Sequence, residues 1–368
     1  MHPVARPGTR PKHRRINVAV VGVGNCASSL VQGISYYTQE PGAPGLIHRS
    51  IADYTASSLH VRVAFDVNSS KIGKRIDEAI FAQPNCTAIF AKRIHCKGLV
   101  MPGPVLDGVS RRLEGSVRPH RLRKSLPAWR RFVIQQLLEN RVDILVSYLP
   151  VGSQQASVFY AECALQARVA FANAIPEFIC STSSWSDKFR SAGVPCAGDD
   201  IKSQLGATIL HRVIVDLIHQ RGLTIDNTYQ LNVGGNTDFQ NMLDEERTAS
   251  KRISKTEAVT SMVPDYALQT KIGPSEYIPH LRDNKIAHIE IRGRQFGGVP
   301  FSIDVKLSVE DSPNCAGAMI DVVRLLKVAK DRGMSGYQDF SAYYFKHPAL
   351  QVRDDDARRL VTAFMDRT

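Results

Sequence analysis

The sequence predicts an α/β fold, a Rossmann-like doubly wound parallel sheet with an inserted α+β domain of mostly antiparallel sheet. Between residues 16 and 200, short apolar runs that end in turn residues alternate with helical segments, which is typical of a parallel sheet covered by helices. From residue 228 the pattern changes to strands of period two. Two of these runs are joined across Gly297-Gly298, which indicates a hairpin.

The first domain is expected to begin with a strand at 16–24, because "INVAVVGVG" is a continuous β-branched run that ends in glycines, as buried parallel strands do. A helix at 26–37 and a second strand at 60–66 follow, with a polar loop at 39–48 between them. The later elements expected in this domain are strands at 142–150, 169–176 and 194–200 and helices at 131–140 and 154–167.

A long amphipathic pattern at 201–222 predicts a helix, with Asp200 as its cap and Lys202 in its first turn. The inserted sheet should follow, and a capped helix at 312–333 should return the chain to the first domain. Helix capping alone would account for Asp311 or Ser312. The strands expected in the inserted sheet are 228–233, 286–296 and 300–309.

These elements divide the chain into four parts. The predicted parts are a disordered basic tail at 1–15, the first part of an NAD-binding Rossmann domain at 16–201, an inserted catalytic and tetramerisation domain at 202–310, and a C-terminal return to the Rossmann domain at 311–368.

The composition is that of an ordinary globular protein, with 43% hydrophobic and 22% charged residues among 368. No apolar run approaches the roughly 20 residues of a membrane span, and the N-terminus has no apolar signal segment, so we expect a cytoplasmic protein without a membrane partner. The seven cysteines form no CxxC pair, which fits reduced thiols and excludes a zinc ribbon.

The net charge of +12 raises the possibility of a nucleic-acid partner. The excess lies in two places, however: the tail 1–15, which has five basic residues and no acid, and the segment 111–131, which has eight basic residues against Glu114. The rest of the chain is balanced, so nucleic acid is not the expected partner. A non-catalytic NAD-binding protein that contacts nucleic acid through these two segments is kept as an alternative.

The stretch "GVGNCA" at 22–27 gives Gly-x-Gly-x-x-Ala directly after a strand and at the start of a helix. Gly22 allows the tight turn, Gly24 lets the backbone approach a pyrophosphate, and the small Ala27 lets helix and strand pack closely. Asn25 and Cys26 complete the turn. The motif predicts a dinucleotide site.

Asp66, at the end of the next strand, is the expected partner of a ribose 2′-hydroxyl, and an acid there favours NAD over NADP. It lies much farther beyond Gly24 than the usual spacing of about 20 residues, which the loop at 39–48 explains as an insertion. An ordinary turn residue at a strand end is the other interpretation of Asp66.

Seven blocks together resemble the myo-inositol-1-phosphate synthase (inositol-3-phosphate synthase) family, in its short prokaryotic form. In chain order they are "VAVVGVGNCASSL", "VSYLPVGS", "GDDIKSQLGAT", "LNVGGNTDFQNML", "SKRISKT", "IGPSEY" and "EDSPNCAGAMIDVVR". The resemblance covers roughly residues 16–350 and departs from the family in the basic tail and in the segment 92–131.

The resemblance implies a redox-neutral, NAD-dependent isomerisation of D-glucose 6-phosphate to 1L-myo-inositol 1-phosphate (1D-myo-inositol 3-phosphate). The sugar is oxidised at C5, enolised at C6, closed by attack of C6 on the C1 aldehyde, and reduced again at C5. It also implies a homotetramer and a monovalent or divalent cation, with the metal site unknown. An NAD-dependent dehydrogenase that releases an oxidised product is the alternative enzyme.

The resemblance also assigns site residues. Those with a catalytic role are Lys251, Lys255, Lys285, Lys346, Asp238, Asp311 and Asn236. Those that resemble cofactor contacts, besides the glycine turn and Asp66, are Tyr148, Asp200 and Ser203. A lysine among other cations has a lowered pKa and can move protons near neutrality. Lys251 is expected to handle the C5 hydroxyl proton, Lys285 to polarise C1, and the other lysines to bind phosphate.

Overall fold

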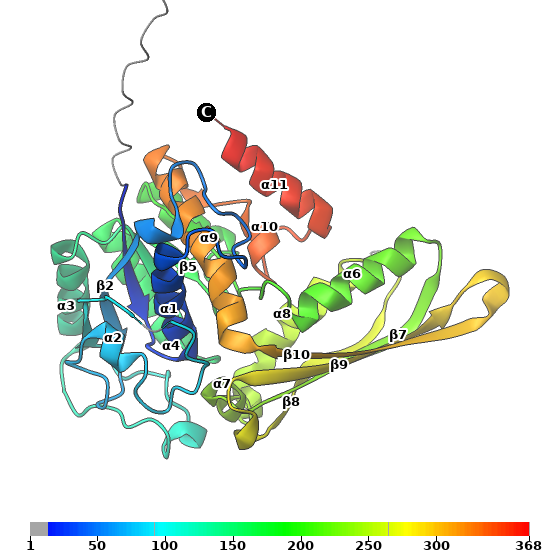
Figure 1. The fold of residues 1–368 in the computed structure, drawn as a ribbon, viewed down its shortest axis with the longest axis horizontal. Helices are drawn as coiled ribbons and strands as arrows, with labels where there is room; N and C mark the ends of the chain where they lie inside the picture. The colour runs from blue at the N-terminus through cyan, green and yellow to red at the C-terminus, as the bar shows by residue number, and fades with distance from the viewer. Residues whose placement is uncertain (1–13, 92, 264, 368) are drawn as a thin grey trace, which may run out of the picture.

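The computed structural model describes residues 14–91, 93–263 and 265–367. Of the predicted basic tail, residues 1–13 lie outside this range. The described chain forms two sheets, one of seven strands and one of four, and the smaller sheet extends away from the larger (Figure 1). No described helix is both long and apolar enough to cross a membrane.

The larger sheet is parallel at every pairing, which confirms the predicted doubly wound architecture. Its strand order is β11-β6-β5-β4-β1-β2-β3. The central strands are continuous apolar runs because both faces of the sheet are covered. The strands are β1 (Ile16–Val21), β2 (Leu59–Asp66), β3 (Leu99–Pro102), β4 (Ile144–Ser147), β5 (Ala170–Asn173), β6 (Pro195–Ala197) and β11 (Gly336–Tyr337).

Helices cover both faces of this sheet. On one face α1 (Asn25–Gln39) and α9 (Asp311–Asp331) lie side by side (Figure 1), and their apolar residues join the β1, β2 and β4 side chains in one core. A second core lies on the other face, where α3 (Leu126–Glu139), α4 (Gln154–Ala167) and α5 (Ser183–Ser191) pack. The helix α9 follows the smaller sheet in the chain, so it fastens that sheet to the first domain.

The remaining helical segments are short or lie at the ends of domains. They are α2 (Ile76–Ala79), α10 (Ser341–Tyr344), α11 (Asp354–Asp366), η1 (Ala56–Ser58), η2 (Arg111–Leu113), η3 (Glu245–Thr248), η4 (Pro279–Leu281) and η5 (Phe296–Gly298).

The smaller sheet has the strand order β10-β9-β7-β8 and is mixed. Its pairings β10–β9 and β9–β7 are antiparallel, whereas β7–β8 is parallel. The predicted hairpin across Gly297-Gly298 is present between β9 and β10, and both glycines have positive φ, which their turn requires. The strands are β7 (Thr224–Gly234), β8 (Gln269–Tyr277), β9 (Asn284–Arg294) and β10 (Pro300–Glu310).

The sequence did not predict β8, because Gly273 and Pro274 interrupt its pattern. Proline is confined to edge strands and bulges, and β8 is an edge strand with a register shift against β7. Two helices, α6 (Ala207–Gln220) and α8 (Ala249–Thr260), pack on one face of this sheet around a third apolar core. A further short helix, α7 (Thr237–Asn241), follows β7.

Two expectations about helix starts are wrong. The helix α6 begins at Ala207 with Gly206 as its N-cap, so Asp200 does not cap it and Lys202 is not in its first turn. Asp200 instead accepts hydrogen bonds from residues far along the chain, and this keeps 200–206 as a loop. The helix α9 begins at Asp311 after Glu310, with no side-chain cap, so capping does not account for Asp311 or Ser312.

Candidate active site

The glycine turn between β1 and α1 has the geometry that the sequence predicts. Gly22 has φ of 86°, and a Cβ there would lie 2.6 Å from the Tyr148 carbonyl oxygen, so no other residue fits. A Cβ on Gly24, in contrast, would meet nothing within 4 Å, which leaves the backbone open to a ligand. The first turn of α1 has neither a side-chain cap nor an acid, so its N–H groups face the cavity unneutralised.

Asp66 supports this turn. Its Oδ2 accepts the Val23 N–H at 2.8 Å and its Oδ1 accepts the Asn68 N–H at 2.7 Å. Each carboxylate oxygen has a second lone pair, so both can still accept a hydroxyl hydrogen bond. Lys71, which the sequence did not single out, is buried beneath the turn and donates to the Val23 carbonyl oxygen at 2.7 Å and to Asn85 Oδ1 at 2.8 Å.

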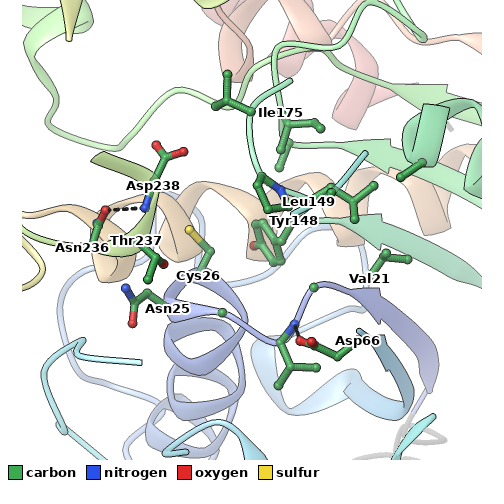
Figure 2. A pocket seen from close by; sticks show the side chains of 18 of the residues that line it. Val21, Asn25, Cys26, Asp66, Tyr148, Leu149, Ile175, Asn236, Thr237 and Asp238 are labelled. Carbon is green, nitrogen blue, oxygen red and sulfur yellow. Dashed lines mark hydrogen bonds between the residues drawn. The ribbon is translucent and has the colours of Figure 1, made fainter. Parts of the chain in front are cut away.

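A single cavity runs from this turn to the lysine-rich segments of the smaller sheet. In Figure 2, Asp66 and Asp238 lie at opposite sides of it, with Cys26 and Tyr148 in between. The Tyr148 hydroxyl is buried and has no hydrogen-bond partner in the described structure. The predicted residues that line the cavity are Gly22, Gly24, Asn25, Cys26, Asp66, Tyr148, Asp200, Ser203, Asn236, Asp238, Lys251, Lys285, Asp311 and Lys346.

Two predicted residues do not line it. Ala27 is buried inside α1, in the core against the sheet, as its packing role requires. Lys255 lies behind the lining lysines, with an exposed fraction of 3%. Every other predicted site residue is brought to one cavity from segments spread between 22 and 346.

Three of the lysines are paired with carboxylates. Lys251 Nζ donates to Asp238 Oδ2 at 3.0 Å, and Lys285 Nζ donates to Asp311 Oδ1 at 3.2 Å. Burial alone lowers the pKa of Lys251, but Asp238 and the other nearby carboxylates outweigh it and raise that pKa above its usual value. Burial likewise raises the pKa of Asp311, but Lys285 and the other lysines outweigh it and lower that pKa.

Lys346 forms the third pair. Its Nζ donates to Asp200 Oδ1 at 2.7 Å and to the Ile201 carbonyl oxygen at 2.8 Å. Asp200 Oδ2 also accepts the Ser254 hydroxyl at 2.6 Å, so this carboxylate connects the C-terminal segment to α8. Although burial opposes it, the neighbouring lysines hold the pKa of Asp200 below its usual value. Asp200 therefore ties α8 and Lys346 together while it lines the cavity.

Lys255 differs from the other three. Within the described residues, its ammonium forms no ion pair and no hydrogen bond. Its burial lowers the pKa well below the usual value, and Lys285, Lys251 and Lys346 lower it further. It is therefore the lysine whose surroundings most favour the neutral amine.

A buried polar cluster around Asp283, a residue that the sequence did not single out, fixes one wall. Asp283 Oδ1 accepts Asn236 Nδ2 at 2.9 Å and the Ser312 hydroxyl at 2.9 Å, which joins β7, β9 and α9. Asn236 in turn caps α7 by accepting the Asp238 and Phe239 N–H groups. Burial raises the pKa of Asp283 to about 6. In the sequence, the only sign of a role for Asp283 is its position two residues before Lys285.

Lys202, next to Asp200, lies outside the cavity. Its ammonium donates to the Ala342 carbonyl oxygen at 2.9 Å and lies 3.6 Å from Asp354. Burial, followed by the nearby Arg212, lowers the pKa of Lys202 to about 7. Its contacts fasten α10 and α11 to the loop before α6, which is a structural role.

Among the described residues, no group of three or more His, Cys, Asp or Glu side chains is placed to hold a metal ion. The fold and this cavity define a Rossmann-like α/β protein whose glycine turn shares one cavity with buried lysine–carboxylate pairs. That combination is typical of enzymes that act on anionic substrates.

The chain belongs to the inositol-3-phosphate synthase family and is an enzyme of that family. It is 48% identical to the inositol-3-phosphate synthase of Mycolicibacterium smegmatis over 95% of this chain and 98% of that protein. It is 45% identical to that of Corynebacterium glutamicum over 95% and 98%. A family model described as Myo-inositol-1-phosphate synthase matches residues 206–312.

Solved structures agree on the fold. A myo-inositol-1-phosphate synthase-related protein from Thermotoga maritima superposes with a TM-score of 0.82 at 23% identity, covering 96% of this chain and 98% of that one. The inositol-3-phosphate synthase of Caenorhabditis elegans superposes with a TM-score of 0.77 at 15% identity, covering 96% and 86%. The relatives that are 45–48% identical confirm the resemblance found in the sequence.

Proposed function

We propose that this enzyme isomerises D-glucose 6-phosphate to 1L-myo-inositol 1-phosphate without net oxidation, using bound NAD. The observation that carries the proposal is the single cavity that joins the glycine turn to Lys251, Lys285 and Lys346. The proposal is also supported by the 48% identity of this chain to inositol-3-phosphate synthases over nearly its full length.

The residues at the glycine turn fit NAD. The open space at Gly24 and the uncapped start of α1 suit a pyrophosphate, and the ring of Tyr148 contributes to the cavity wall with its hydroxyl buried. Asp66 suits the adenosine ribose and would repel a 2′-phosphate. When bound, NAD supplies a hydride acceptor at the start of the cycle and a hydride donor at its end.

The lysine pairs supply the positive charge that the substrate requires. Glucose 6-phosphate carries a dianion, and its C1 carbonyl oxygen gains negative charge when the ring closes. Lys251 and Lys346 are each held in the cavity wall by an ion pair with a carboxylate, and their positive charge suits the phosphate. Lys285, paired with Asp311, suits the C1 oxygen, where a fixed cation stabilises developing charge.

The surroundings of Lys255 favour it over Lys251 as the final acceptor of the C5 hydroxyl proton, which must be relayed to it because Lys255 does not line the cavity. The sequence argument gave that proton to Lys251 because a lysine among cations has a lowered pKa. In the structure, Asp238 helps to raise the pKa of Lys251, whereas the pKa of Lys255 is lowered. A neutral amine at Lys255 Nζ can take a proton, and Asp200 then partly offsets the charge that it gains.

A homotetramer is part of the same proposal. The outer face of α6 exposes Val213 by 49% and Leu217 by 56%, although α6 already buries its other face on the smaller sheet. Light scattering coupled to size-exclusion chromatography tests this, and a monomer at micromolar concentration would contradict it. The proposal includes either a monovalent or a divalent activating cation. Turnover is compared in potassium and in magnesium after bound metal has been removed with a chelator, and the salt that restores activity identifies the class of cation.

The deciding experiment incubates the enzyme with NAD and glucose 6-phosphate and follows NADH absorbance beside inositol phosphate. We expect inositol phosphate to form over many turnovers while NADH stays below the enzyme concentration. Stoichiometric NADH with an oxidised sugar would establish the dehydrogenase instead. Binding of NAD with no turnover would leave the non-catalytic interpretation.

A further inference from the structure

A second cavity lies at the opposite end of the seven-stranded sheet from the active site. The active-site cavity is lined by the ends of β1 and β2, at Val21 and Asp66, whereas this one is lined by the beginnings of β2 and β3, at Leu59 and Leu99. In a parallel sheet the strands all begin at one end and finish at the other, so the two cavities lie at opposite ends of the strands. The two cavities are therefore separate sites.

The fold creates this cavity by leaving half of a strand edge unpaired. The strand β3 pairs with β2 only from Val63 to Asp66, so residues 59–62 have no β3 partner. The segment 93–98 runs past that gap instead, and the Cys96 thiol donates to the Val61 carbonyl oxygen at 3.2 Å. The hollow beside the gap has a volume of about 590 Å³, enough for a small molecule.

Basic side chains surround the hollow, and no Asp or Glu lines it. They come from β2 and from the segment 93–98, and they are His60, Arg62, Arg93, His95 and Lys97. None of the five appears in an ion pair or a side-chain hydrogen bond among the described residues. Burial lowers the pKa of His60, and the nearby Arg15 and Arg62 lower it further.

Unpaired cations that converge on a hollow are stabilised by an anion that lies between them. Arg62, Arg93 and Lys97 together contribute three formal positive charges, so a single phosphate dianion leaves one of them unbalanced. Arginine forks bind phosphate oxygens in pairs, and phosphoryl groups present oxygens in several directions, which suits donors from two segments. The partly exposed Leu99, Met101 and Ile34 also line the cavity and provide an apolar wall.

We propose that this cavity binds a small molecule carrying two or more phosphate groups, separately from NAD and glucose 6-phosphate. Its concave form favours a small ligand over nucleic acid, which needs a track of cations along a surface. The large basic excess at 111–131 is not part of it. The site does not depend on the reaction proposed above, since it shares no residue with the active-site cavity.

The test is calorimetric titration of the full-length protein with sodium tripolyphosphate, with and without saturating NAD and glucose 6-phosphate. We expect one tripolyphosphate per chain, with Kd unchanged by the active-site ligands. Arg62→Ala/Arg93→Ala should weaken binding at least about tenfold through lost charge-assisted hydrogen bonds. The matched control Arg121→Ala/Arg123→Ala removes the same charge from the exposed loop before α3 and should change Kd less than about twofold.

Absence of binding would overturn the proposal, as would equal weakening in both double variants or competition by NAD. Citrate binding as tightly as tripolyphosphate would overturn the phosphate class. An oligonucleotide that needs Arg62 and Arg93 while tripolyphosphate does not bind would show a nucleic-acid site instead. If Arg62→Ala/Arg93→Ala does not fold, His95→Gln/Lys97→Met, which changes only the exposed segment, carries the same expectation.

Discussion

Lys251 and Lys255 lie one turn apart on α8, yet the structure gives their ammonium groups opposite surroundings. Lys251 Nζ donates to Asp238 Oδ2 at 3.0 Å, and nearby carboxylates raise its pKa despite burial. Lys255, buried among cations, has its pKa lowered well below the usual value. One turn of helix thus separates a lysine whose pKa is raised by its carboxylate partners from one whose pKa is lowered by burial and neighbouring cations.

We therefore expect Lys255→Met to lower kcat by about 10²–10⁴-fold, the contribution of a positioned general base. Methionine keeps most of the buried volume, so NAD affinity and the unfolding midpoint should stay close to those of the wild type. Steady-state inositol phosphate formation measures the loss. The matched control is Arg252→Met, which removes a positive charge from the exposed face of the same helix and should leave kcat within about twofold.

The pH dependence tests the same residue. A base acts when deprotonated, so kcat/KM should rise with pH through the lowered pKa of Lys255. This limb should vanish in Lys255→Met and persist in Arg252→Met. A limb that survives unchanged in Lys255→Met would assign the proton to another group.

Loss of the Lys251 side chain is expected to weaken binding of glucose 6-phosphate. Lys251→Ala should raise KM for glucose 6-phosphate by roughly 10–100-fold, because a charge-assisted contact to the phosphate is lost, while kcat falls less than about tenfold. Inhibition by inorganic phosphate should weaken in parallel. The opposite outcome, a large fall in kcat with KM unchanged, would return the C5 proton to Lys251, where the sequence argument placed it.

Asp66 should control cofactor affinity. Asp66→Ala removes both the predicted ribose contact and the acceptor of the Val23 N–H at the turn, so we expect the Kd for NAD to rise by about 10–100-fold. Titration followed by tryptophan fluorescence or calorimetry measures it. The exposed Asp53→Ala is the control for charge, and a Kd within twofold of the wild type in Asp66→Ala would reduce Asp66 to a turn residue.

How far the sequence predicted the site depends on the range of each interaction. The β1 strand, the Gly22 turn and α1 are specified by local pattern, and the structure reproduces them. The start of α6 was missed because Asp200, a plausible local cap, is taken by Ser254 and Lys346 from distant segments. Local rules cannot anticipate such competition.

The same limit applies to the lysines. Their motifs place Lys251, Lys285 and Lys346 at a common site, but the pKa of each depends on which carboxylate the fold brings to it. Spacing along α8 makes Lys251 and Lys255 equivalent. They are distinguished by Asp238, which the turn from β7 into α7 places beside Lys251, and by the burial of Lys255 among cations.

Asp199, the neighbour of Asp200, gives a stability prediction. Its carboxylate accepts the Ile179, Cys180 and Ser181 N–H groups at 3.0–3.1 Å, and also Ser181 Oγ and Asn173 Nδ2. Asp199→Asn places an amide N–H₂ against these donors. We expect it to lower the free energy of unfolding at pH 7 by about 1–3 kcal/mol, measured by urea denaturation. The control is Asp187→Asn, which removes an exposed carboxylate on α5.

The pH dependence of that difference has a definite sign. Burial raises the pKa of Asp199 to about 6, above the ordinary 3.8 that it has in the unfolded chain. Between these values the folded state holds a proton that the unfolded state has lost, so the contribution of Asp199 to stability falls as pH rises. The unfolding free energy of the wild type minus that of Asp199→Asn should fall by roughly 1 kcal/mol per pH unit between about 4 and 6, and then level off. A difference that rises across this window would mean that the five donors outweigh burial and hold the pKa of Asp199 below its ordinary value.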